Sequence, residues 1–196
     1  MSINVVLTLS SLFLVLVIGG CTKVVDPNFA QDQDANELVF GYIQVETDGS
    51  NPRGYPTHVR FIAMTETTTR ERFRVDVRSD SDVFSLRLPV GTYSVDRVQF
   101  NEGPFMYESH VQLEFHVPEG KAVYLGVWQF DVETPRTIRH MRIQVAEGDQ
   151  ELPMLFSANL VTDSTPITTV LPKPEVFETR VFTVAPYPKI KYFYRQ

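Results

Sequence analysis

The chain has 196 residues, of which 43% are hydrophobic and 21% are charged, and its formal net charge is −6. This length accommodates one sizeable domain with tails rather than two ordinary domains. The acidic balance argues against nucleic acid as a partner, because phosphates require a basic surface, and against polybasic attachment to anionic lipids. Cys21 is the only cysteine, so no disulfide within the chain can hold the domain together, and burial must do so.

An uncharged apolar segment leads up to this cysteine. Residues 5–20 contain only three polar side chains, and no charged residue precedes Lys23. A transmembrane helix needs about 20 apolar residues, whereas a secretory signal needs about 7–15 followed by small residues. The segment ends in Ile18-Gly19-Gly20-Cys21, which resembles the lipobox of bacterial lipoproteins. We therefore expect a signal peptide over 1–20 and acylation of Cys21, with an uncleaved membrane helix and plain secretion as alternatives.

The same resemblance suggests a location. In lipoproteins of double-membrane bacteria the residue after the acylated cysteine influences sorting, and an aspartate there is associated with retention in the inner membrane. Thr22 is not an aspartate. We expect an outer-membrane lipoprotein that faces the periplasm, is held by its acyl chains and has an envelope protein as its partner.

The remaining chain divides into three parts. Residues 21–36 are polar and predict a flexible tether. Residues 37–161 carry the ordered patterning of a domain. Residues 162–196 contain several prolines and predict a stiff linker followed by an aromatic tail.

Alternation of apolar and polar side chains predicts strands throughout the domain. The clearest case is Phe73, Val75 and Val77, which alternate with charged residues. In 58–65, Val59 and Phe61 are expected to share one face. Strands are expected over 38–46, 58–65, 71–78, 83–88, 92–100, 111–117, 122–130 and 138–145, with two short β-like pieces over 180–184 and 189–194. Helical spacing occurs only over 150–160, so the prediction is an all-β fold, an antiparallel β-sandwich with one short helix.

One strand–turn–strand segment carries a family resemblance. The segment Phe84-Ser85-Leu86-Arg87-Leu88-Pro89-Val90-Gly91-Thr92-Tyr93 resembles that of transthyretin-like and carboxypeptidase-regulatory-like β-sandwich domains. Residues 117–126 are similar to a companion hairpin in small bacterial lipoproteins of this fold. The resemblance covers 38–160 and implies a fold but no ligand residues. We also predict that Gly91 has a positive φ in a turn between two paired strands.

A row of arginines is the candidate anion site. Guanidinium groups suit bidentate contact with phosphate or carboxylate, such as lipid A or cell-wall groups. The alternative is that carboxylates on neighbouring strands neutralise the row, as Asp76 within it already suggests. A looser group of three arginines lies within 136–142, and the same alternative applies to it. The candidate residues are Arg70, Arg72, Arg74 and Arg78.

The histidines and carboxylates give no metal or catalytic motif. His110 and His116 share a strand face but lie about 20 Å apart, and only Glu114 with His116 could chelate one ion. A solvated sheet face is the simpler interpretation. No nucleophile elbow, metal-binding motif or phosphate loop is present in the sequence, so we expect no enzyme and no cofactor.

Aromatic side chains on the C-terminal tail would cost solubility unless they pack. They are Tyr187, Tyr192, Phe193 and Tyr194. The tail either folds back as an edge strand on its own domain or adds a strand to the sheet of a partner. The sequence therefore predicts a lipid-anchored β-sandwich that acts as a non-enzymatic interaction or envelope-support module. The alternative is a periplasmic ligand-binding or hydrolytic domain that uses a sheet face or loop cluster.

Overall fold

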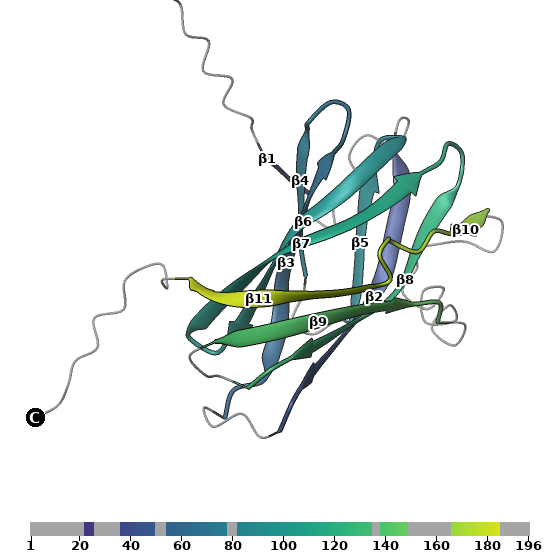
Figure 1. Cartoon of the computed structure of the whole chain (residues 1–196). Helices are drawn as coiled ribbons and strands as arrows, with labels where there is room; N and C mark the ends of the chain where they lie inside the picture. The colour runs from purple at the N-terminus through teal and green to yellow at the C-terminus, as the bar shows by residue number, and fades with distance from the viewer. Residues whose placement is uncertain are drawn as a thin grey trace, which may run out of the picture.

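The computed structural model describes residues 22–25, 36–49, 54–77, 82–134, 138–148 and 166–184. Within these ranges the regular structure consists of strands (Figure 1). No helix long and apolar enough to cross a membrane occurs in the described part of the chain. The strands are β1 (Thr22–Val25), β2 (Glu37–Thr47), β3 (Thr57–Glu66), β4 (Arg72–Asp76), β5 (Val83–Leu88), β6 (Gly91–Glu102), β7 (Phe105–Val117), β8 (Ala122–Val132), β9 (Arg139–Ala146), β10 (Ile167–Thr169) and β11 (Val176–Val184).

The strands form one continuous mixed sheet. Its order is β1-β4-β3-β6-β7-β11-β9-β8-β2-β5, and β10 pairs with β8 off this path. The sheet curls around the core into a nearly closed barrel with one unsealed seam between its two ends (Figure 1). The strands at the two ends of this order, β1 and β5, therefore lie at the opening, and the sheet does not divide into two separate layers.

The predicted antiparallel two-sheet sandwich is therefore wrong, and β11 is the main reason. Residues 176–181 pair with β9, and residues 182–184 pair with β7, so this one strand joins what would have been two sheets. These residues were expected to form a linker and tail, and only 180–184 were expected to be β-like. In addition, β1–β4, β10–β8 and the long β2–β8 ladder are parallel.

Segments at both ends of the chain contribute to the sheet. β1 lies within the residues expected to form a tether, and it pairs with β4. β10 and β11 lie beyond residue 161. The helix expected over 150–160 falls outside the described residues.

The alternation of apolar and polar residues along the strands explains how the core forms. β7 and β9 alternate buried and exposed side chains along most of their length, as one-sided strands do. β8 is buried on both faces over its first seven residues, as expected for a central strand. Trp128 lies at the centre of the core, where its ring contacts Phe84 and Phe130. Its indole nitrogen donates to the Leu125 carbonyl at 3.0 Å, so its buried polar atom has a partner.

Gly91 does not adopt the predicted conformation. It is the first residue of β6, pairs with Val117, and is not among the glycines with positive φ. β5 and β6 do not pair with each other, so the turn between them does not close a hairpin. A glycine fits here for another reason: a Cβ would lie 3.1 Å from Oε1 of Glu66. The Tyr93 hydroxyl donates to the Pro89 carbonyl at 2.7 Å and stabilises the turn.

Candidate binding groove

The strand registers define two ends of the molecule. Thr22 pairs with Arg72, Glu37 pairs with Leu88, and Gly91 pairs with Val117, so these residues mark one end, the Thr22 end. β2 and β8 run in parallel from this end to the opposite one. The opposite end carries a groove and is called the groove end.

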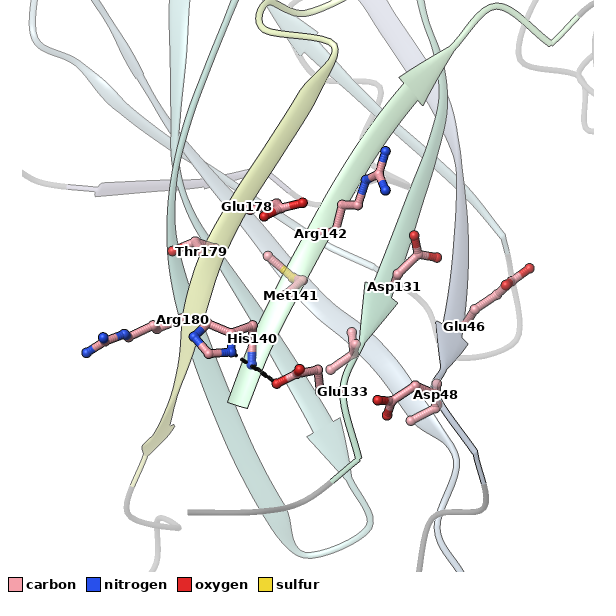
Figure 2. Close-up of a pocket in the computed structure, with 12 residues that line it drawn as sticks. Glu46, Asp48, Asp131, Glu133, His140, Met141, Arg142, Glu178, Thr179 and Arg180 are labelled. Atoms are coloured by element: carbon pink, nitrogen blue, oxygen red, sulfur yellow. Dashed lines mark hydrogen bonds and ion pairs between the residues drawn. The ribbon is translucent and has the colours of Figure 1, made fainter. Parts of the chain in front are cut away.

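The groove has a volume of about 750 Å³ and crosses four neighbouring strands (Figure 2). β2, β8 and β9 contribute residues near their ends at this side of the molecule, and β11 contributes residues from its middle. The lining residues are Glu46, Thr47 and Asp48 from β2 and its end, Asp131, Val132 and Glu133 from β8 and its end, His140, Met141 and Arg142 from β9, and Glu178, Thr179 and Arg180 from β11.

Strand pairing arranges the charged side chains in two rows. In the first row Glu46 pairs with Asp131, Asp131 pairs with Arg142, and Arg142 pairs with Glu178. The second row lies two residues further along each strand, where side chains return to the same face. It consists of Asp48, Glu133, His140 and Arg180. From β2 to β11, the first row therefore presents two acidic side chains, a basic one and an acidic one. The second row presents two acidic side chains, an imidazole and a basic side chain.

Hydrogen bonds hold several of these carboxylates in place. The backbone nitrogen of Thr134 donates to Asp48 Oδ1, and the Gln129 side-chain amide donates to Asp131 Oδ1 at 2.9 Å. Glu133 Oε2 accepts from the backbone nitrogen of His140 at 2.7 Å and lies 3.2 Å from its Nδ1. The same carboxylate oxygen thus contacts both backbone and ring of His140, so this pair stabilises the β8–β9 connection as well as orienting the imidazole.

The groove carries an excess of negative charge. Its five carboxylates against two arginines leave a charge of −3 with His140 neutral. Within the described residues, neither Arg142 nor Arg180 makes an ion pair. Both guanidinium groups are exposed and can contact a ligand.

The predicted arginine row is only partly preserved as a group. Arg72 is exposed on β4, and Arg70 lies in the β3–β4 turn with a φ of 63°. Arg74 instead contacts Asp76 Oδ1 at 2.5 Å and lies over the Phe61 ring at 4.3 Å. Arg74 is therefore paired within its own strand rather than with a carboxylate of a neighbouring strand. Arg78 lies outside the described residues.

Arg139, expected to belong to a surface group, is buried. Its Nη2 lies 2.5 Å from Oε1 of Glu102, which also accepts from the Thr57 hydroxyl at 2.9 Å. Its Nε donates to the Glu133 carbonyl at 2.5 Å, beside the groove. Of the three arginines in 136–142, Arg142 lines the groove and Arg136 lies outside the described residues.

The two histidines of β7 have different neighbours. His116 lies near the Thr92 hydroxyl at 3.3 Å, whereas the His110 ring lies 6.3 Å from that of Phe182. Among the residues that the structure describes, no three His, Cys, Asp or Glu side chains are placed to hold a metal ion. Cys21 and the tail aromatics Tyr187, Tyr192, Phe193 and Tyr194 lie outside the described residues, so their roles stay predictions.

No protein-family model, no curated protein and no solved structure matches the chain.

Proposed function

We propose that this chain is a lipid-anchored, non-enzymatic binding protein of the cell envelope, whose groove recognises a partner protein in the periplasm. The observation that carries the proposal is the pair of charged rows across β2, β8, β9 and β11. Because backbone pairing fixes their spacing, the rows offer a partner a defined charge pattern rather than a diffuse field.

Charges of both signs suit recognition. Exposed ion pairs contribute little affinity each, but complementary patterns steer encounter and set the register of a partner. The excess of carboxylates favours a partner with several basic side chains. Arg142 and Arg180 would face carboxylates of that partner, so a uniformly basic segment would fit less well.

The anchor rests on the sequence. An apolar run that ends in Ile18-Gly19-Gly20-Cys21 is typical of a lipoprotein signal, and two or more acyl chains hold a protein on a bilayer durably. Thr22, the residue that follows, lies at the end of the molecule opposite the groove. Anchoring through Cys21 would leave the groove free to face the periplasm. The anchor is tested by fatty-acid labelling and membrane fractionation: Cys21→Ser should abolish labelling, and a variant that labels like the parent contradicts the anchor.

The groove is tested by site-specific crosslinking in intact cells. A photo-crosslinking residue at Thr47 should give an adduct of defined mass, whereas the same residue at the exposed Gln112 on β7 should not. The double reversal Asp131→Lys/Glu178→Lys should abolish the Thr47 adduct if charge recognition forms it. An adduct that survives the reversal, or that forms equally from Gln112, contradicts the proposed site.

A further inference from the structure

A second hollow lies on the opposite part of the sheet. It has a volume of about 720 Å³ and is lined by residues of β3, β4, β6 and β7. One row of paired residues crosses it: Arg72 pairs with Thr65, Thr65 with Ser94, and Ser94 with Glu114. With strands about 4.8 Å apart, this row runs roughly 14 Å from a guanidinium to a carboxylate at the backbone level. The hollow is thus cationic on one side and anionic on the other.

The cationic side consists of Arg70 and Arg72. Both side chains are exposed, and neither makes an ion pair with any part of the described chain. Arg97, also in the lining, is already engaged, because it lies 3.4 Å from Glu108 and over the Phe61 ring. The two free guanidinium groups, with the nearby Ser94 hydroxyl, have the chemistry that binds a phosphate group.

The anionic side consists of Asp96 and Glu114. Asp96 lies at the β6 bulge, where the pairing with β7 shifts between Val95 and Arg97, and its Oδ2 accepts from the Thr65 hydroxyl. Glu114 is exposed on β7, and its backbone is fixed by hydrogen bonds to Lys173. These carboxylates would repel a plain anion but would attract an ammonium group.

The register of β1 connects this hollow to the membrane. β1 runs parallel to β4, with Thr22 opposite Arg72. Cys21 is one residue earlier, and consecutive Cα atoms are about 3.8 Å apart. An acyl anchor on Cys21 therefore brings the bilayer surface next to the cationic side of the hollow.

We propose that this hollow binds a phosphoethanolamine headgroup of the membrane in which the protein is anchored. The phosphate contacts Arg70 and Arg72, and the ammonium group contacts Asp96 and Glu114. The assignment rests on the proposed anchor, since Cys21 places the headgroups beside β4. It goes beyond that proposal because it names a second binding site and its ligand.

Calorimetry on the acylated full chain in a phosphate-free maltoside detergent tests the site. Glycerophosphoethanolamine should bind saturably, and Arg70→Ser/Arg72→Ser should weaken it at least tenfold. The matched control is Arg142→Ser/Arg180→Ser, which removes two exposed arginines from the groove and should bind like the parent. Thermal midpoints of both variants check that each is folded.

Binding measurements with further ligands test the phosphate and the ammonium group of the headgroup separately. Glu114→Gln should weaken the binding of glycerophosphoethanolamine but should not weaken that of glycerol phosphate, which has no ammonium group and is repelled by the carboxylate. If glycerol phosphate binds the parent as tightly as glycerophosphoethanolamine, or inorganic phosphate does, the headgroup assignment is overturned. The absence of saturable binding also overturns it. Fatty-acid labelling of the same preparation tests the anchor separately, so an acylated protein that binds no headgroup leaves the anchor intact.

Discussion

Gly126 shows how a single residue fixes a register. The β2–β8 ladder shifts between Phe40 and Tyr42, opposite the stretch of β8 that contains this glycine. Gly126 has a φ of +81°, and a Cβ there would lie 2.5 Å from the Ala146 carbonyl oxygen. Side chains are therefore excluded both by the backbone conformation and by a close approach of β9.

Alanine substitutions separate these two effects. Gly120 also has a positive φ of +72°, but no atom lies within 4 Å of a Cβ built there. Gly120→Ala should cost roughly 1–2 kcal/mol of unfolding free energy, the cost of the left-handed conformation alone. Gly126→Ala should cost clearly more in chemical denaturation. Equal losses in the two variants would show that the contact with Ala146 imposes no constraint.

Glu66 makes the stability of the β3–β4 turn depend on pH. Its carboxylate accepts from the backbone nitrogens of Thr69 and of Thr68, the latter at 2.8 Å, and these bonds hold its pKa below the ordinary 4.5 although burial opposes them. Because the folded pKa is below the unfolded one, the stabilisation is fully present above pH about 4.5 and is lost as the pH falls through the folded pKa. The thermal midpoint of the parent should therefore exceed that of Glu66→Gln by an amount that shrinks between pH 6 and pH 3. Glu119→Gln, in an exposed turn, is the control, and a constant difference for Glu66→Gln would contradict the prediction.

Glu102 and Arg139 form a buried ion pair at the groove end. The Glu102 side chain is 0% exposed and that of Arg139 is 3% exposed. Arg139→Met should destabilise the domain by about 3–5 kcal/mol, because it leaves a buried carboxylate without its counter-charge. The double variant Glu102→Leu/Arg139→Met should regain part of this loss in the same urea titration. If the double variant is less stable than the single one, packing rather than charge determines the effect.

β11 is the element that converts two layers into one sheet. It pairs with β9 over its first part and with β7 over its last three residues. Ser109 on β7 adds a side-chain hydrogen bond to the Arg180 carbonyl at 3.1 Å. In the order of the sheet, β11 connects β7 to β9. Loss of β11 should therefore affect the whole domain.

A proline within β11 tests this dependence. Thr179 pairs with Met141 in the β9–β11 ladder, and Thr179→Pro should disrupt that ladder. The thermal midpoint should fall in a single transition, by about 2–4 °C for each kcal/mol lost in a domain of this size. Thr179→Val keeps a residue that favours strands and is the control. A Thr179→Pro protein that melts like the parent would show that the sheet is stable without the β9–β11 ladder.

Local alternation predicted the elements well, but it could not predict how they pair. Strands were expected close to the observed β2 to β9, because each has an apolar face of period two. Val59 and Phe61 were expected on one face, yet a register shift between them brings Ile62 into the main core beside Val59. The pairing partner and the register of a strand depend on residues far away in the sequence, so no local pattern reveals them.

The groove was missed for the same reason. His140 and Arg142 occupy the exposed positions of an alternating strand, so their face could be predicted. Asp131 faces Arg142 across the β8–β9 ladder, but Glu46 joins them only through the parallel β2–β8 ladder, and Glu178 only through β11. The sequence showed which side chains face outward but not which of them lie together.

At the scale of the whole molecule, the two proposed sites lie in different places. The headgroup hollow lies beside β1, whereas the groove crosses the opposite ends of β2 and β8. β2 has 11 residues, which at about 3.3 Å per residue gives roughly 36 Å between the two ends. An anchored molecule standing on its Thr22 end would hold the groove well outside the headgroup layer.

This orientation can be measured with fluorescent labels, because an acylated Cys21 leaves no free thiol and an introduced cysteine becomes the only labelling site. Val90 is 48% exposed in the β5–β6 turn at the Thr22 end, and Glu46 lines the groove at the other end. In vesicles that contain a lipid-borne quencher, a label at Val90→Cys should be strongly quenched and a label at Glu46→Cys should keep its intensity. The short parallel pairing of β1 with β4 is the reason, since Cys21 directly precedes Thr22, the first residue of β1. Equal quenching of the two labels would mean that the domain lies on its side. If neither label is quenched, the residues before β2 hold the domain away from the bilayer, and β1 does not stay paired in the anchored protein.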